Sequence, residues 1–198
     1  MAIPAKKMKT SKKRIEMNIL HSSKEDSWKT PKYIMDLVHA VMPVIDLDPA
    51  SDPEANKLIG AKTIITREQD GLITDWAPGS VFINPPGGKK GNQSLTSAFW
   101  IKLMKQRQAG NLKEAIFLAF SVEALQTTQN KGFPSLGDFT VCIPSKRIKF
   151  DHPSEVKKAP SHSSAIVYVH GTEDNQSVFT HCFKDLGVVL TDKERDSL

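Results

Sequence analysis

The feature that most constrains the fold of this chain is a continuous apolar run from Ala115 to Phe120. An apolar run without polar alternation is typical of a strand that is buried on both faces of a sheet. A helix-like pattern precedes it, from Ser94 to Arg107. Five other segments are predicted to be strands: 44–48, 62–66, 80–83, 139–143 and 165–169. Strands that alternate with helices predict an α/β fold with a doubly wound, mostly parallel sheet.

Local signals predict where several helices begin and end. Thr30 is expected at the N-cap of the first helix, with Pro31 at its first helical position. A brief helix is expected from Glu54 until Gly60 stops it. Further helices are predicted over 122–129 and over the amphipathic stretch 178–186.

Length and composition limit the class of protein. The 198 residues fit one domain, predicted over 27–198, and 39% hydrophobic residues suffice for a core. No apolar run approaches the roughly 20 residues of a membrane span. Residues 1–14 lack the apolar stretch of a signal peptide. We therefore expect a cytoplasmic protein that makes no membrane contact; the sequence predicts nothing about its oligomeric state.

Positive charge is concentrated at the N-terminus. The net charge is +5, and all the lysines and arginines up to Arg14 precede the first acidic residue, Glu16. Residues 1–26 are predicted to form a basic, flexible arm. Such an arm is attracted to phosphate backbones, although lysine-rich termini also occur as solvated tails.

No metal site is predicted. Cys142 and Cys182 form no C-x-x-C pair and are interpreted as buried thiols. The histidines include no helix-spaced pair, and a structural or solvent role is favoured for His152 and His162, which flank one loop.

Two turns, 48–52 and 84–88, directly follow predicted strands. In open α/β sheets, ligands bind beyond the carboxyl ends of the strands, so both turns mark a candidate site. Asn84-Pro85-Pro86 offers the Asn84 Oδ1 and the Pro85 carbonyl, which together can accept both hydrogens of an exocyclic amine. Held in this way, the amine can attack a sulfonium methyl without a strong general base. A base within a duplex must flip out to reach such a site. The alternative is an ordinary loop, because turn-forming residues gather in loops.

The order of the motifs resembles that of the phage-type, Dam-like DNA N6-adenine methyltransferases over residues 28 to about 171. The similar segments are Trp28-Lys29-Thr30-Pro31, 46–51 with Asn56, 70–72 with Trp76, 81–86, 144–150 and 163–169. The resemblance implies a Rossmann-like class I methyltransferase fold with a terminal antiparallel hairpin, and S-adenosylmethionine as methyl donor. It implies DNA as the substrate, with N6 of adenine favoured over cytosine, and the host cytoplasm as the location if the chain is phage-encoded.

The resemblance also implies roles for single residues. Asn84, Pro85 and Pro86 would hold the target amine. The residues implied in cofactor binding are Trp28, Thr30, Pro31, Asp48, Pro49, Ala50, Ser51 and Asp70. Trp28 can alternatively be a core aromatic, and Asp48 and Asp70 can be turn or cap residues.

Two positions depart from the family pattern. The cofactor loop usually has a glycine pair that lets the backbone approach the ligand, whereas this chain has Ser51-Asp52-Pro53. Gly87 stands where such enzymes normally carry an aromatic ring, whose stacking on a base is worth about 1–3 kcal/mol. Either another aromatic supplies that ring, with Phe99 and Trp100 as the candidates, or the substrate is not a flipped adenine.

Two basic clusters are candidate nucleic-acid contacts. Lys89 and Lys90 lie among glycines in a predicted mobile loop beside Asn84. Lys146, Arg147 and Lys149 form the second cluster, in which Arg147 and Lys149 share one face if the segment is extended. Solvated lysines are the alternative for both.

The sequence thus favours a DNA methyltransferase and leaves two other interpretations open. One is a catalytically inactive nucleic-acid-binding protein with the same fold, motivated by Gly87 and the basic arm. The other is an enzyme that methylates a different amine or an amide, such as a glutamine side chain.

Overall fold

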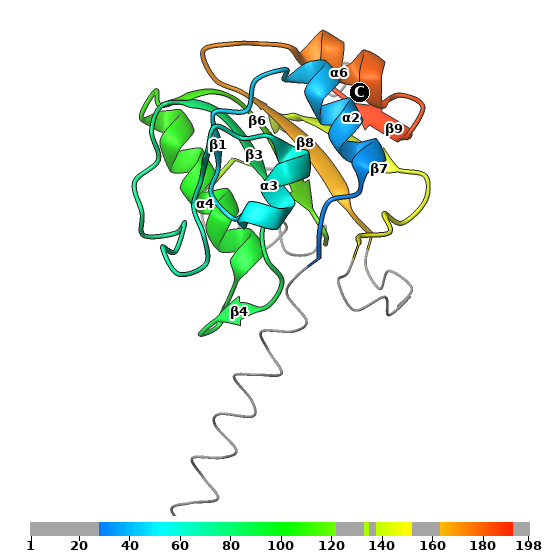
Figure 1. Cartoon of the computed structure of the whole chain (residues 1–198). Coiled ribbons are helices and arrows are strands. Elements are labelled where there is room, and N and C mark those ends of the chain that lie inside the picture. The colour runs from blue at the N-terminus through cyan, green and yellow to red at the C-terminus, as the bar shows by residue number, and fades with distance from the viewer. Residues whose placement is uncertain (1–27, 122–132, 135–137, 152–162, 192–198) are drawn as a thin grey trace, which may run out of the picture.

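A seven-stranded sheet runs through the centre of the protein, in the order β2-β1-β3-β6-β8-β7-β9 (Figure 1). The computed structural model describes residues 28–121, 133–134, 138–151 and 163–191. The predicted arm, the helix over 122–129 and both loop histidines lie outside these residues. The strands are β1 (Leu47–Asp48), β2 (Thr63–Ile64), β3 (Gly79–Ile83), β6 (Leu112–Ala119), β7 (Thr140–Pro144), β8 (Ala165–His170) and β9 (Gly187–Leu190).

The sheet is mostly parallel, as the sequence predicts. Strands β2, β1, β3 and β6 pair in parallel. Strand β8 lies antiparallel between β6 and β7, and β9 pairs antiparallel with β7. Therefore β1, β2, β3, β6 and β7 share one direction, and only β8 and β9 oppose it. The apolar run that predicted a doubly buried strand is the core of β6.

Helices cover both faces of the sheet. They are α2 (Lys32–Val41), α3 (Pro53–Ile59), α4 (Leu95–Gln108) and α6 (Gln176–Phe183). Apolar residues of α4 pack on one face, and those of α2, α3 and α6 pack on the other (Figure 1). The mixed α/β layering predicted from the alternation of strands and helices is confirmed.

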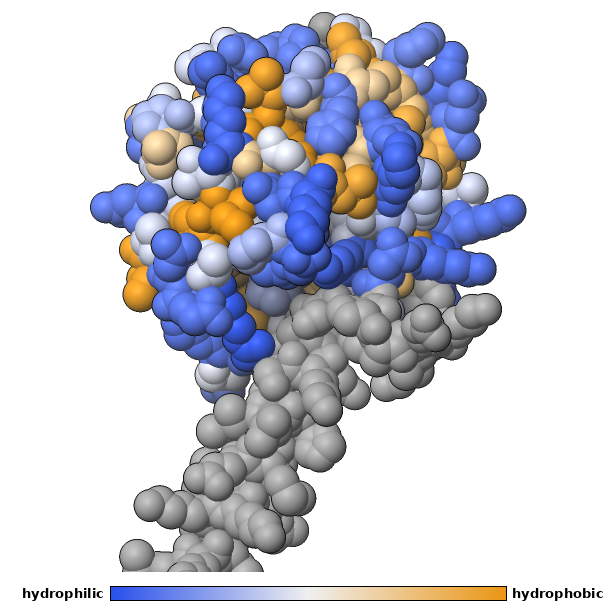
Figure 2. All heavy atoms as spheres, in the orientation of Figure 1, coloured by the Kyte–Doolittle hydropathy of each residue, from blue (hydrophilic) through white to orange (hydrophobic). Residues whose placement is uncertain are grey.

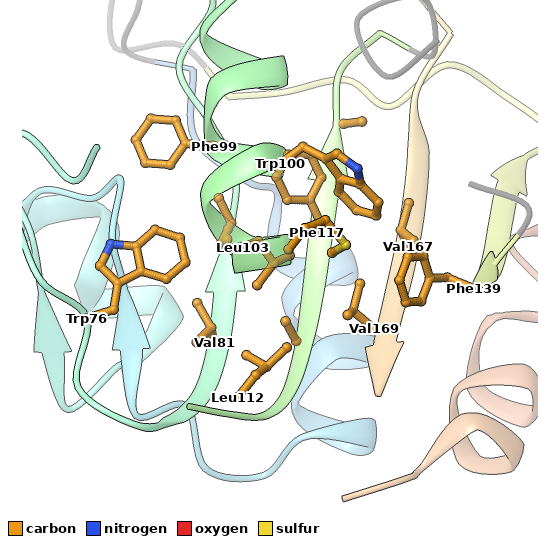
Figure 3. Packing of buried hydrophobic residues seen from close by; sticks show 14 of the residues in the cluster. Trp76, Val81, Phe99, Trp100, Leu103, Leu112, Phe117, Phe139, Val167 and Val169 are labelled. Carbon is orange, nitrogen blue, oxygen red and sulfur yellow. The ribbon is translucent and has the colours of Figure 1, made fainter. Parts of the chain in front are cut away.

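Trp100 of α4 lies at the centre of the first core layer. Its ring meets Phe117 and Phe139 edge-on, with centroids 5.2 and 5.6 Å apart (Figure 3). Only 1% of Trp100 is exposed, and Phe99 is buried beside it. The expectation that one of these rings stacks on a flipped base is therefore wrong, because both rings are buried in the core against the sheet.

Local sequence signals predict the beginning of α3 correctly and miss that of α2 by one residue. Helix α3 follows Asp52, whose side chain accepts hydrogen bonds from the first-turn amides at 2.8 and 2.9 Å, and ends at Gly60 in the left-handed conformation, as predicted. Helix α2 begins at Lys32 with Pro31 as its N-cap residue, one position later than predicted. Thr30 caps nothing, because its hydroxyl accepts a hydrogen bond from a distant side chain, that of Asn84.

The segment after the Asn84 turn is a hairpin rather than the predicted loop. Strands β4 (Lys89–Lys90) and β5 (Gln93–Ser94) pair antiparallel. Gly91 and Asn92 make the two-residue connection, and Gly91 has φ 62°. A Gly-Asn pair between two short segments is a recognised hairpin signal, so this hairpin could have been predicted from the sequence.

The order of the parallel strands creates a switch point between β1 and β3. The chain leaves β1 toward β2 on one side and then crosses to β3 on the other side of β1. Connections that diverge from neighbouring strands leave a crevice at their carboxyl ends, where open α/β sheets bind ligands. Asp48 ends β1, and Asn84 directly follows β3.

Candidate active site

The side chain of Asn84 is fixed in one orientation at the end of β3. Its Nδ2 donates a hydrogen bond to Thr30 Oγ1 at 3.1 Å and lies 3.5 Å from the Trp28 carbonyl oxygen. A carbonyl only accepts, so the amide must present its nitrogen to this side. Oδ1 therefore points away, and none of the residues that the structure describes donates to it. This oxygen is available to a ligand hydrogen.

The two prolines extend this acceptor surface. Pro85 is buried and Pro86 half-buried, and neither has an N–H group to compete for the nearby carbonyls. The register of β3 with β6, in which Ile83 lies opposite Phe117, sets the turn beside the end of β6. The Asn84-Pro85 pair thus forms a rigid, acceptor-only edge of the crevice.

Asp48 is a buried carboxylate without a cation. Only 1% of it is exposed, and its Oδ1 accepts a hydrogen bond from the Ala50 amide at 3.0 Å. Burial raises the pKa of Asp48 to about 7, against the opposing effect of the Ala50 amide. No lysine, arginine or histidine in the described part of the chain pairs with it. A buried charge of this kind is costly unless a partner neutralises it.

Ser51 adds a buried hydroxyl to the same loop. The hydroxyl interacts with Asp48 and lowers the pKa of that carboxyl group, although its Oγ makes no hydrogen bond of normal geometry to the described residues. A hydroxyl beside a carboxylate that lacks a cation fits a polar, positively charged ligand group.

The loop after β2 packs against the Asp48 loop. A Cβ on Gly71 would lie 1.9 Å from the Pro49 carbonyl oxygen, so only glycine fits. The glycine pair that would let the cofactor loop approach a ligand is absent from this chain. The close backbone contact here is between two protein loops. The preceding residue, Asp70, has φ 52°, and its Oδ1 accepts from the Leu72 amide at 3.0 Å.

Asp70 already has a cationic partner. Its Oδ2 lies 2.9 Å from Lys90 Nζ in the hairpin, and this hydrogen bond lowers the pKa of Asp70. The ion pair joins a predicted cofactor residue to a predicted DNA contact. Lys90 therefore connects the hairpin to the loop after β2. The sequence did not indicate this contact.

Two residues outside the predicted site hold the loop that contains Asp70. Trp76 is buried, and its Nε1 donates to the Gly71 carbonyl at 2.9 Å. Lys102 of α4 donates to the Leu72 carbonyl at 3.1 Å and lies 5.4 Å from the centre of the Trp76 ring. Trp76 lies five residues from Gly71 and belongs to a segment that carries the family resemblance, whereas Lys102 comes from a distant helix that no local pattern connects to this loop.

The second basic cluster is exposed in full. Lys146, Arg147 and Lys149 are exposed, and Ile148 is buried between the last two, which agrees with Arg147 and Lys149 sharing one face. A backbone bridge between Lys29 and Asp151, with N···O distances of 2.8 and 3.0 Å, ties this segment to the chain entering the site.

Two of the candidate contact segments lie on one side of the molecule. In Figure 1, the start of the described chain and the β4 hairpin both lie toward its lower side. Hydrophilic side chains cover much of the face that Figure 2 shows. Lys89 of the hairpin is exposed. Among the described residues, no group of three or more metal-binding side chains occurs, and no helix is long and apolar enough to cross a membrane.

The predicted site residues fall into two groups. Trp28 and Thr30 contact Asn84, and Pro31 follows them as the helix N-cap. The loop from Asp48 to Ser51 instead contacts the loop of Asp70 and Gly71. The two groups end neighbouring strands, because β1 pairs with β3.

A comparison with protein families agrees with this geometry. The sequence model of the family described as DNA N-6-adenine-methyltransferase (Dam) matches residues 18–165, well over half of the chain. No curated protein and no solved structure matches the chain. The match spans the Asp48 loop, the Asp70 loop and the Asn84 turn. The chain belongs to the Dam family of DNA N-6-adenine-methyltransferases.

Proposed function

We propose that this protein transfers a methyl group from S-adenosylmethionine to N6 of adenine in DNA. The observation that carries the proposal is the orientation of Asn84, which turns Oδ1 away from Thr30 and Trp28 at the end of β3, beside the switch point of the sheet. Membership of the Dam family supports the same reaction and substrate. The strand order, with one antiparallel strand inserted between β6 and β7, supports a Rossmann-like methyltransferase fold.

Asn84 and Pro85 prepare the amine for attack. The lone pair of an adenine amine is delocalised into the ring, so the nitrogen is a poor nucleophile. Asn84 Oδ1 and the Pro85 carbonyl accept the two N–H hydrogens and draw the nitrogen toward tetrahedral geometry. The N–C bond then forms as the methyl–sulfur bond breaks, and the surplus proton leaves the nitrogen for water. Positioning supplies most of the rate, and the crevice provides it without a strong base.

The loop from Asp48 to Ser51 fits the polar end of the cofactor. S-adenosylmethionine supplies an electrophilic methyl group on a sulfonium, and it carries an ammonium group. Asp48 offers the buried carboxylate that lacks a cation, and Ser51 offers a buried hydroxyl beside it. Trp28, Pro31, Pro49 and Ala50 complete the proposed pocket, and Asp70 contributes to it while paired with Lys90. The Thr30 hydroxyl instead contacts Asn84.

Phosphate groups would contact the exposed basic side chains around the crevice. Lys89 lies on the hairpin that follows the Asn84 turn, and Lys146, Arg147 and Lys149 lie on the segment tied to Lys29. Such contacts fix the register of DNA and make its binding depend on salt. A DNA substrate implies the cytoplasm, of a host cell if the chain is phage-encoded.

Nucleoside mass spectrometry tests this proposal. Purified protein, unmethylated duplex DNA and S-adenosylmethionine should yield N6-methyladenine, and omission of the protein should abolish it. Methylcytosine alone would overturn the choice of base. Calorimetry without DNA separates the remaining cases: binding of S-adenosylmethionine with no methylated nucleoside would favour another acceptor, and no binding would favour an inactive DNA-binding protein.

A further inference from the structure

Thr30 occupies an unusual position for a residue at a helix start. It is 4% exposed, and its hydroxyl accepts the hydrogen bond from Asn84 Nδ2 instead of capping α2. We infer that Thr30 is a positioning residue for methyl transfer: it holds the Asn84 amide in the orientation that the Trp28 carbonyl selects, so that Oδ1 faces the acceptor amine. This inference rests on the proposed function and replaces the cofactor-binding role that the family resemblance implies for Thr30.

The two orientations of an asparagine amide have nearly the same shape and opposite chemistry. Turned by half a rotation, Asn84 would present two N–H donors to an amine that also offers two N–H donors, and the amine could not be held. Something in the protein must therefore select one orientation. The Trp28 carbonyl contributes at 3.5 Å, which is long for a hydrogen bond. The Trp28 carbonyl selects the orientation because it can only accept, whereas the Thr30 hydroxyl, the closer contact at 3.1 Å, holds the amide in that orientation.

The main chain holds the Thr30 hydroxyl in place from both sides. On the amino side, the backbone bridge to Asp151 fixes Lys29. On the carboxyl side, Pro31 restricts the backbone, and its carbonyl accepts the amides of Ile34 and Met35 at 3.0 and 3.2 Å. The acceptor for Asn84 is thus preorganised, which is what a positioning group requires.

A pair of variants separates positioning from packing. Thr30→Val keeps the volume and removes the acceptor, whereas Thr30→Ser keeps the acceptor and removes a methyl group. We expect Thr30→Val to slow single-turnover methyl transfer about tenfold, the worth of one hydrogen bond, with the affinity for S-adenosylmethionine unchanged by calorimetry. Thr30→Ser should retain most of the rate. Thr140→Val is the matched control, because it removes a buried hydroxyl that has no partner within the described residues, from the far end of β7.

The outcomes distinguish this inference from the proposed function. If the wild type methylates DNA and Thr30→Val is as fast as the wild type, the positioning role is wrong. It is also wrong if Thr30→Val weakens the binding of S-adenosylmethionine as much as it slows methyl transfer, because a loss of cofactor affinity would then explain the slower rate. A structural readout remains if Thr30→Val fails to fold or the wild type shows no methyl transfer: in the wild type, the Asn84 side-chain amide hydrogens should show a nuclear Overhauser effect to the Thr30 methyl group. Its absence would overturn the inference by itself.

Discussion

Asp48→Asn is expected to stabilise the free protein at alkaline pH while weakening its binding of S-adenosylmethionine. Asp48 is 1% exposed and has no cationic partner among the described residues, and burial raises its pKa from 3.8 to about 7. Asparagine keeps the shape and can still accept the Ala50 amide through Oδ1. The substitution therefore removes the buried charge and leaves the turn intact.

The pH dependence follows from where the proton is bound. In the unfolded chain the carboxyl group loses its proton near pH 4, whereas in the folded protein it keeps the proton to about pH 7. The folded state therefore binds more protons between these values, and the wild type loses stability as pH rises through this range. Each pKa unit corresponds to about 1.36 kcal/mol, so the full effect above pH 7 is about 4 kcal/mol, an upper bound for what the asparagine variant regains.

Urea unfolding of both proteins without ligand, at pH 5 and pH 8.5, measures the difference. The advantage of Asp48→Asn over the wild type should grow by a few kcal/mol between these pH values. Asp36→Asn, the same substitution at an exposed position of α2, provides the control. An advantage that is the same at both pH values would refute the reasoning about the buried charge. Loss of a charge-assisted hydrogen bond to the ammonium group should raise the Kd for S-adenosylmethionine about 10- to 100-fold.

Two further comparisons test the contacts around the crevice. Lys89→Ala should weaken DNA binding and reduce its salt slope by about one, while Lys90→Ala, which breaks an ion pair inside the protein, should mainly increase hydrogen exchange in the hairpin; equal effects of both on the salt slope would contradict this division. Gly71→Ala should weaken cofactor binding, because its Cβ would displace the Pro49 carbonyl, whereas Gly87→Ala meets no atom within 4 Å and should bind the cofactor normally. Calorimetry checks the glycine pair, and a tolerated Gly71→Ala would count against the tight contact of the two loops.

The sequence predicted the elements whose signals are local. The β6 run, the Asp52 and Gly60 ends of α3 and the turn after β3 each depend on a few neighbouring residues. The alternation of these elements was enough to predict the α/β sheet and the placement of Asp48 and Asn84 at strand ends. The ion pair of Lys90 and the selection of the Asn84 orientation could not be predicted, because their partners lie 20 and 54 residues away.

Aromatic residues of α4 show why closeness in sequence does not identify the ring that would replace the aromatic absent at Gly87. The helix follows the Asn84 turn closely in sequence, which made Phe99 and Trp100 the nearest rings. The sheet beneath α4 takes both of them into its core (Figure 3). Exposed aromatics near the site come instead from the start of the chain: Trp28 is 37% exposed, and its carbonyl lies beside Asn84.

Methyl transfer by Asn84→Ala tests the central claim most directly. The substitution removes the Oδ1 acceptor and leaves the Asp48 loop untouched, so S-adenosylmethionine should bind with unchanged affinity while N6-methyladenine in DNA falls below detection by nucleoside mass spectrometry. The wild type, measured beside it, should produce the methylated base. An Asn84→Ala protein that methylates adenine at the wild-type rate would contradict the account, because the amine would then be held by something other than this turn.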